Sequence, residues 1–239
     1  MSISTRRLYH EDDYLFECDA IVAAIRDGAL AFDRTCYYPG GGGQPSDSGL
    51  VTFDSGLQAE IASASSDADG LIWHASSATA ALGDRAHLAL DAARRMAFMR
   101  YHTVLHVLNT ITLREYGGWI TGAQIGVEYS RIDFKLETLS TQVRDALERR
   151  VNEVLSSRST LRSYTIAEDE FRARPELLRT LEAQPPVVDG KVRVVEIEGF
   201  DAQACGGTHV HSTAQVGEFS ITRTENKGRI NKRFYVKLA

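Results

Sequence analysis

Short apolar runs separated by turn-forming residues dominate residues 1–90. Such runs, bounded by Gly, Pro, Asn, Asp and Ser, are typical of β-strands, and they occur at 29–32, 49–53 and 70–74. A helix is expected before them, over residues 12–25, with Gly28 as its stop. The pattern predicts a β-rich N-terminal domain over 1–90, resembling a small β-barrel.

The spacing of apolar residues changes in residues 91–239. Residues 94–108 contain no Gly or Pro and predict a helix. Residues 140–158 predict an amphipathic helix, with Val143, Leu147 and Val151 on one side and Ser140 as its N-cap. Strands are expected at 124–129, 131–136, 161–166, 192–197, 217–222 and 234–238. The predicted fold class is α+β, with helices packed on an antiparallel sheet in a second domain over 91–239.

Two pairs of metal-binding residue types stand about a hundred positions apart. His102 and His106 are four residues apart in the predicted helix, so their side chains share one face. Cys205 and His209 enclose two glycines, which favour a turn or strand end. Thiolate and imidazole ligands suit Zn²⁺. In the alternative interpretation these are ordinary buried side chains. His211, two residues past His209, is a further possible ligand or pocket residue, with a partly exposed bystander as its alternative.

Composition describes an ordinary globular protein. The 239 residues are 43% hydrophobic and 25% charged. There is no apolar run long enough to cross a membrane and no apolar signal-peptide segment. Three cysteines are too few and too scattered for a disulfide framework. We therefore expect a soluble, cytoplasmic protein, with Cys18 and Cys36 as small buried residues.

The net charge of −5 does not indicate a nucleic-acid-binding protein as a whole. Any RNA binding must use a local basic patch, and the sequence offers two. One is Arg94, Arg95 and Arg100; the other comprises Arg223, Lys227, Arg229, Lys232, Arg233 and Lys237. In the alternative interpretation each patch is only a solvated face.

A run of four glycines occupies positions 40–43. Consecutive glycines let the backbone approach a ligand closely, but the Gly-Lys-Ser/Thr ending of a nucleotide triphosphate loop is absent. ATP binding is therefore not expected. The alternative is a tight loop without a ligand.

Four motifs together carry a family resemblance. They are Thr35–Gly49 with its glycine run, His102-Thr103-Val104-Leu105-His106, Cys205-Gly206-Gly207-Thr208-His209, and Glu225–Arg233. In this order they resemble the editing domain of alanyl-tRNA synthetase and its free-standing relatives, the AlaX-type alanyl-tRNA editing proteins. The resemblance covers nearly the whole chain.

The resemblance implies a hydrolase that deacylates mischarged Ser-tRNA(Ala) or Gly-tRNA(Ala). The length leaves no room for an aminoacylation domain, so the protein is expected to act in trans. Zn²⁺ is implied at His102, His106, Cys205 and His209. Substrate contacts are expected from Gly42, Gly43, Gln44, Thr103 and Gln124, and tRNA contacts from Arg94, Arg95, Arg100, Lys227, Arg229, Lys232 and Arg233.

Two other functions fit the same residues. One is a non-catalytic RNA-binding module stabilised by a structural zinc site in which all four positions are filled by protein ligands. The other is a related zinc hydrolase that edits a different misacylated tRNA. A covalent mechanism through Cys205 is disfavoured, because a zinc-bound thiolate is a poor free nucleophile.

Overall fold

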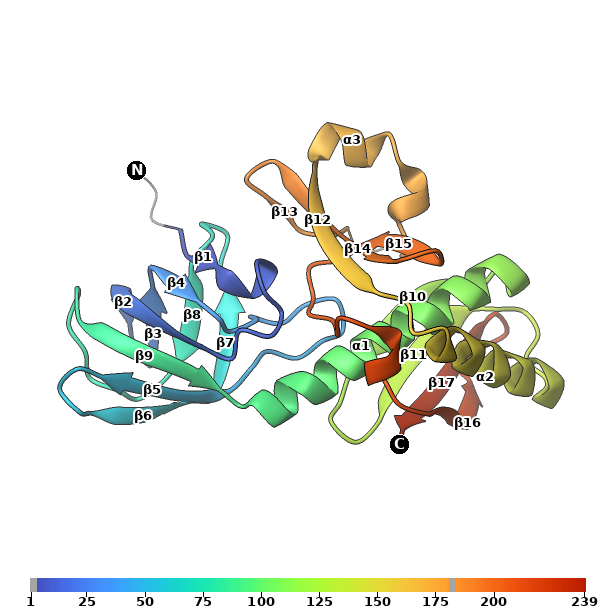
Figure 1. Ribbon diagram of the computed structural model, residues 1–239, viewed down its shortest axis with the longest axis horizontal. Helices are drawn as coiled ribbons and strands as arrows, with labels where there is room; N and C mark the ends of the chain where they lie inside the picture. The colour runs from blue at the N-terminus through green and yellow to red at the C-terminus, as the bar shows by residue number, and fades with distance from the viewer. Residues whose placement is uncertain (1–3, 181–183) are drawn as a thin grey trace. The chain divides into compact units, whose positions relative to one another are not determined.

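The computed structural model describes residues 4–180 and 184–239, and Figure 1 shows its helices and strands. The chain divides into two compact units, residues 1–41 with 45–96 and residues 42–44 with 97–239. Part of the glycine run therefore belongs to the second unit. Helix α1 (Ala92–Tyr116) begins in the first unit and ends in the second. That residues 1–90 and 91–239 form two separate domains remains a prediction.

The first unit is built on a seven-stranded antiparallel sheet with the order β6-β5-β9-β2-β3-β8-β7. Its strands are β2 (Glu17–Arg26), β3 (Ala29–Phe32), β5 (Gly49–Phe53), β6 (Gln58–Ile61), β7 (Ser63–Ser66), β8 (Ile72–Ala75) and β9 (Arg85–Leu90). A parallel pair, β1 (Arg6–Arg7) with β4 (Arg34–Thr35), lies outside this sheet, as does a short 3₁₀ helix at Leu8–His10. The predicted strands at 29–32 and 49–53 are confirmed, and that at 70–74 begins at Ile72.

The seven strands enclose one hydrophobic core that includes Phe32, Val51, Ile61 and Leu88, all fully buried. Strands β6 and β7 are the two outermost strands of the sheet, yet only Ala62 separates them in the chain. The two ends of the sheet are thus joined covalently, although β6 and β7 are not paired with each other. Among the described residues the sheet follows an open path, so strand pairing closes no barrel.

The predicted helix at 12–25 is wrong, because most of this segment forms strand β2. Burial alternates along it, with Ala20 and Val22 buried and Asp19 and Ile21 exposed. The early part of β2 pairs with β9 and the later part with β3, and a bulge lies between Val22 and Ala24. Cross-strand packing on both edges has overridden the helical preference of an alanine-containing run.

Helix α1 is the central helix of the second unit, and every residue from 101 to 112 is buried. A helix buried on all sides shows no simple amphipathic pattern. Here its buried positions include His102, Thr103, His106 and Asn109 as well as apolar residues. The helix predicted at 94–108 is confirmed and is longer at both ends. Its buried polar groups mark where the chemistry of this unit is concentrated.

The second unit contains two four-stranded antiparallel sheets. The first has the order β10-β11-β17-β16, formed by β10 (Trp119–Gln124), β11 (Ser130–Lys135), β16 (Phe219–Asn226) and β17 (Asn231–Leu238). In the second, β14 (Lys191–Ile197) pairs with β12 (Leu161–Ala167), β13 (Val187–Val188) and β15 (Asp201–Ala204). Figure 1 shows α3 (Glu168–Arg172) next to β12, and short 3₁₀ helices lie at Pro175–Leu177 and Thr213–Gln215.

Most strand predictions for this unit are confirmed within a few residues. The exception is 124–129, because β10 ends at Gln124. Antiparallel sheets with helices packed against them confirm the α+β class. No helix in the described part of the chain combines the length and the apolar character needed to cross a membrane.

Helix α2 (Thr141–Ser156) protects the free edge of β16. Ser140 caps it as predicted, accepting a 3.2 Å hydrogen bond from the Val143 amide. The Asn152 side chain then donates to the Phe219 carbonyl at 2.8 Å and accepts from the Phe219 amide at 2.9 Å. An unpaired sheet edge is a site for unwanted strand addition. At the edge of β16, the Asn152 side-chain amide makes the two hydrogen bonds with the Phe219 backbone that a neighbouring strand would make.

Candidate metal centre

Helix α1 presents two of the four predicted ligands. His102 and His106 are 5% and 7% exposed, and their rings meet edge to face with centroids 5.0 Å apart. The spacing of four residues places both on one face of the helix. Because α1 is buried over this stretch, both imidazoles point into the interior of the unit.

The other two ligands come from the loop after β15, which ends at Ala204. The Cys205 amide donates to the Arg193 carbonyl at 2.9 Å, and the buried Arg193 guanidinium donates to the Gly207 carbonyl at 2.7 Å. Arg193 on β14 therefore holds the loop from both its backbone and its side chain. The prediction that Cys205 follows a strand end is confirmed.

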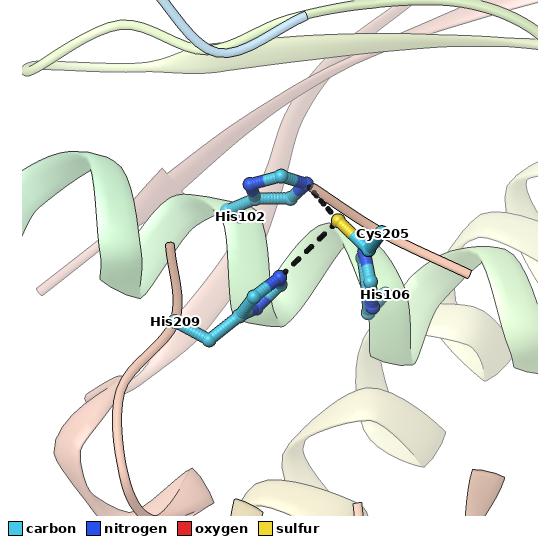
Figure 2. Close-up of side chains that lie close together, drawn as sticks. All are labelled: His102, His106, Cys205 and His209. Carbon is cyan, nitrogen blue, oxygen red and sulfur yellow. Dashed lines mark hydrogen bonds between the residues drawn. The ribbon is translucent and has the colours of Figure 1, made fainter. Parts of the chain in front are cut away.

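Figure 2 shows the four side chains converging, with α1 on one side and the loop on the other. Cys205 Sγ is 3.5 Å from His102 Nε2 and 3.5 Å from His209 Nε2, and all four donor atoms lie within 4.8 Å of one another. A tetrahedral ion with bonds of about 2.3 Å to sulfur and about 2.0 Å to nitrogen separates such donors by about 3.5 Å. The group is therefore spaced to hold a metal ion. The exposed His211 is not part of it.

The tautomer of His102 is fixed by Gln44. The Gln44 side-chain oxygen accepts from the Thr208 amide at 3.1 Å, so this atom must be the oxygen and not the nitrogen. The same oxygen lies 2.8 Å from His102 Nδ1, which must therefore carry the proton. This leaves Nε2 of His102 with a free lone pair facing Cys205.

Thr103 contacts the corresponding ring nitrogen of His209. Its hydroxyl oxygen is 3.1 Å from His209 Nδ1 and accepts from the Val210 amide at 3.3 Å. Partners of this kind orient metal-binding imidazoles and raise their basicity. Cys205 has its own support, a 3.4 Å hydrogen bond donated to its sulfur by the Gly207 amide.

The glycines of the motif are required by space. A β-carbon on Gly207 would overlap Cε1 of His102 and lie 2.9 Å from the Gln44 oxygen. A β-carbon on Gly206 would lie 2.8 Å from Cγ of Pro186. A side chain at Gly207 would push the loop away from helix α1, and one at Gly206 would push it away from Pro186. The short spacing from Cys205 to His209 depends on these close approaches.

Burial keeps the three imidazoles neutral. It is the main cause that lowers the pKa of His106 to about 3, with smaller effects from Arg179 and Arg193. It also lowers the pKa of His102 and of His209 well below the usual range, and neighbouring histidines and Arg193 act in the same direction. Metal binding needs neutral imidazole. The cluster meets that requirement at neutral pH without losing protons from its rings.

A buried polar network supports the His106 end of the cluster. The Gln203 amide donates to the His106 carbonyl at 3.2 Å, to Thr110 at 2.9 Å and to Asp201 at 2.9 Å. Asn109 in turn donates to Gln203 at 3.0 Å. These contacts tie helix α1 to strand β15.

The predicted substrate contacts lie at different distances from the cluster. Gln44 and Thr103 contact the ligand imidazoles directly. Gly43 packs on β10, where an added β-carbon would be 2.7 Å from the Ala123 carbonyl oxygen, and Gly42 has open space at that position. Gln124 is exposed and accepts a 2.8 Å hydrogen bond from Arg131. Gln124 therefore does not contact the four donors.

Three of the residues predicted to contact tRNA make hydrogen bonds within the protein. Arg95 is fully buried in an ion pair with Asp47 and also donates to the Asp13 and Cys36 carbonyls. Lys232 is buried and donates to the Gly228 and Arg229 carbonyls. Both side chains are buried, so the structure gives no support to Arg95 and Lys232 as RNA contacts, which stay a prediction. Arg100 donates to the Val216 and Ala239 carbonyls and so anchors the C-terminal strand.

The other four differ in exposure. Arg233 forms a two-pronged ion pair with Asp133, with both bonds 2.7 Å long. Lys227 is exposed and 3.2 Å from Glu225, Arg229 is exposed, and Arg94 is half-buried. Lys227 and Arg229 are thus the most accessible of the predicted RNA contacts.

Sequence reasoning missed Arg193, Gln203 and the orienting role of Gln44. Arg193 and Gln203 lie in strands of ordinary composition, and the loop and helix groups that they contact, Gly207 and His106, are 14 and 97 residues away in sequence. No local pattern identifies such residues. For Gln44, its place directly after the glycine run was the available signal, and it suggested a ligand contact instead of a contact with His102.

Comparison with known proteins identifies the family. Residues 192–235 match the family model described as threonyl and alanyl tRNA synthetase second additional domain. The chain is 36% identical over 243 residues to the alanyl-tRNA editing protein AlaX-M of Methanosarcina acetivorans, covering 98% of this chain and 99% of that protein. It is 31% identical to AlaX-M of Saccharolobus solfataricus, covering 97% and 98%.

A longer relative shares the same region. The chain is 36% identical over 222 residues to the alanine–tRNA ligase of Korarchaeum cryptofilum, covering 92% of this chain and 24% of the ligase. The matched part of the ligase therefore corresponds to nearly the whole of this protein. With identity above 30% to AlaX-M proteins over almost their full length, this chain belongs to the AlaX-M family of alanyl-tRNA editing proteins.

Proposed function

We propose that this protein hydrolyses the ester of tRNA(Ala) mischarged with serine, and of tRNA(Ala) mischarged with glycine, at a zinc site. Membership of the alanyl-tRNA editing family supports the reaction and the substrate. The observation that carries the proposal is the convergence of three buried imidazoles, His102, His106 and His209, with the half-buried thiol of Cys205, next to the glycine-rich segment.

Three imidazoles and one thiolate form a ligand set that suits zinc. A bound zinc ion would polarise the ester carbonyl or lower the pKa of a bound water. In the reaction, the oxygen of water adds to the carbonyl carbon, the bond from that carbon to the ribose oxygen breaks, and the ribose oxygen takes up a proton. The products are the free amino acid and intact tRNA.

The protein contributes orientation and charge. Gln44 and Thr103 keep Nδ1 of His102 and of His209 engaged, so that both Nε2 atoms stay directed at the site. Arg193 and Arg179 supply fixed positive charge, since both lower the pKa of His106. The field that disfavours an imidazolium ion there favours an oxyanion, which develops at the ester carbonyl in the transition state.

Selection of serine over alanine requires a group that bonds the extra hydroxyl. Thr103 is our candidate, because its oxygen accepts from the Val210 amide and, when Nδ1 of His209 carries the ring proton and leaves Nε2 for the metal, its own hydroxyl proton remains to be donated. Gly42 and Gly43 are proposed to border the aminoacyl group. Gln124 is exposed, and we propose that it contacts the acceptor end of the tRNA outside the metal site.

The test is the deacylation rate of Ser-tRNA(Ala) and Ala-tRNA(Ala) by the zinc-loaded protein. We expect fast loss of serine, slow loss of alanine, and no activity above background for Cys205→Ala. Cys18→Ala removes a thiol from strand β2 and serves as the matched control, which should retain full activity. Equal rates for Cys205→Ala and Cys18→Ala would refute the role of the cluster.

One observation favours a second function. Four converging donors leave a tetrahedral ion without an open position, as in structural zinc sites. Zinc binding and tRNA binding without cleavage of either ester would therefore identify a zinc-stapled RNA-binding module. Cleavage confined to mischarged tRNA of another identity would instead identify a related editing enzyme.

A further inference from the structure

The sheet β10-β11-β17-β16 has one buried face and one open face. Ile132, Phe134, Phe234 and Val236 fill the buried face and are at most 1% exposed. The residues that alternate with them in β11 and β17 are partly or fully exposed. We call the side that carries these alternate positions the outer face. It belongs entirely to the second unit.

The outer face is basic although the chain is acidic. The strand register places five basic residues on it, namely Arg131, Lys135, Arg223, Arg233 and Lys237. Asp133 and Glu225 are the acidic residues at the corresponding paired positions of β11 and β16. The whole protein has a net charge of −5. Such a local excess of positive charge is typical of a surface that meets a polyanion.

The carboxylates on this face are already paired. Asp133 accepts both hydrogen bonds of Arg233, and Glu225 pairs with Arg223 and with Lys227. Both acids are largely covered, with side chains 13% and 21% exposed. They therefore offset part of the positive charge without presenting a separate negative surface to a partner.

Planar groups form a row across the four strands. The register aligns Gln124, Arg131, Tyr235 and Arg223. The guanidinium carbon of Arg223 is 4.9 Å from the centre of the Tyr235 ring, and Arg131 bonds Gln124 at 2.8 Å. Tyr129 is 51% exposed and its ring centre is 6.3 Å from that of Tyr235. Guanidinium and aromatic planes beside positive charge suit bases and phosphates together.

The row ends at β10, next to the glycine-rich segment that contacts the metal centre. Gln124 ends this strand, and the next residue, Ile125, donates its amide to the Gly43 carbonyl at 2.8 Å. Gly43 precedes Gln44, which contacts His102. A nucleic acid lying along the row would thus reach the glycine-rich segment that borders the four donors.

We propose that the outer face, centred on Arg131, Tyr235 and Arg223 with Tyr129 beside them, binds the RNA of the substrate. The identity of that RNA as tRNA rests on the proposed function. An acidic protein would match the charge, but the exposed aromatic ring and the arginine stacked on Tyr235 favour a partner with planar bases. This surface replaces Arg95 and Lys232, which are buried.

The test compares tRNA binding by wild-type protein and Arg131→Ala/Arg223→Ala at several salt concentrations. We expect Kd to rise at least about tenfold, and the slope of log K against log salt to fall by about 2, one for each lost phosphate contact. Tyr129→Ala should weaken binding about tenfold with an unchanged slope. Arg131→Lys/Arg223→Lys should retain the slope.

The matched control is Arg149→Ala/Arg162→Ala, which removes two exposed arginines from α2 and β12, with side chains 68% and 65% exposed. A Kd and slope for the outer-face variant equal to those of this control would overturn the inference. Competition by polyglutamate as strong as by tRNA would also overturn it, in favour of an acidic protein partner.

Deacylation by the same variants separates the two proposals. If the outer face binds the substrate RNA, Arg131→Ala/Arg223→Ala should raise KM and leave kcat within about twofold. Cleavage by the wild type with unchanged KM in the variant refutes the outer face and keeps the proposed function. Binding through the outer face with no cleavage supports the inference and refutes the proposed function.

Discussion

Gln44 links the glycine-rich segment to the metal centre, and its removal should weaken zinc binding. Gln44→Ala deletes the acceptor of His102 Nδ1, which lies at 2.8 Å, and two bonds to Thr208, at 3.1 and 2.9 Å. The His102 ring then loses the partner that fixes its tautomer and orientation. Loss of such an outer partner costs about 10- to 100-fold in metal affinity. This corresponds to about 1.4 to 2.7 kcal/mol.

The same substitution should lower the stability of the metal-free protein. Three buried hydrogen bonds at about 1 kcal/mol each give a loss of about 3 kcal/mol in the free energy of unfolding. Stability and metal affinity must therefore be measured separately. Urea unfolding of the metal-free protein gives the first, and competition for Zn²⁺ with a chromophoric chelator gives the second.

Gln203→Ala is the matched control, because Gln203 is equally buried and makes four hydrogen bonds, close to the three of Gln44. It contacts the backbone carbonyl of His106 and not an imidazole ring. We expect a similar loss of stability but a zinc affinity within about threefold of wild type. If Gln44→Ala bound zinc as tightly as wild type, or if both variants lost affinity equally, the orienting role of Gln44 would be refuted.

Three further predictions concern the fold and the site. Gly207→Ala places a methyl group against the ring of His102, so zinc affinity should fall at least about tenfold and unfolding should be easier by about 1–3 kcal/mol, measured by zinc competition and thermal unfolding. Burial lowers the pKa of His74 to about 4, so its contribution to stability is fully present above pH 6.5 and is lost as the pH falls toward 4. Wild type should therefore lose about 3 kcal/mol more than His74→Gln between pH 7 and pH 4 in urea unfolding, and equal losses would contradict this assignment. Asp47→Asn leaves the buried Arg95 charge unpaired and should cost about 3–5 kcal/mol in the free energy of unfolding, whereas a loss below about 1 kcal/mol would show that water reaches this pair.

Local patterns in the sequence determined several elements of this protein. Ser140 followed by apolar residues at helical spacing predicted helix α2 and its cap, and alternation predicted β11. The pair His102 and His106 followed from helical geometry, and the glycines between Cys205 and His209 indicated a turn. In each case the deciding interactions join residues only a few positions apart, so the sequence displays them directly.

The tertiary structure alone decided the rest. Residues 17–26 form a strand because β9 and β3 pair with both of their edges, and the segment does not carry that information itself. Gln44 acts on His102 because folding brings together residues 58 positions apart. The basic residues divide in the same way: Arg95 is neutralised by Asp47, whereas Arg131 and Arg223 lie on an open sheet face. The sequence shows which residues are charged, but the folded chain decides which partner each charge has and how exposed it is.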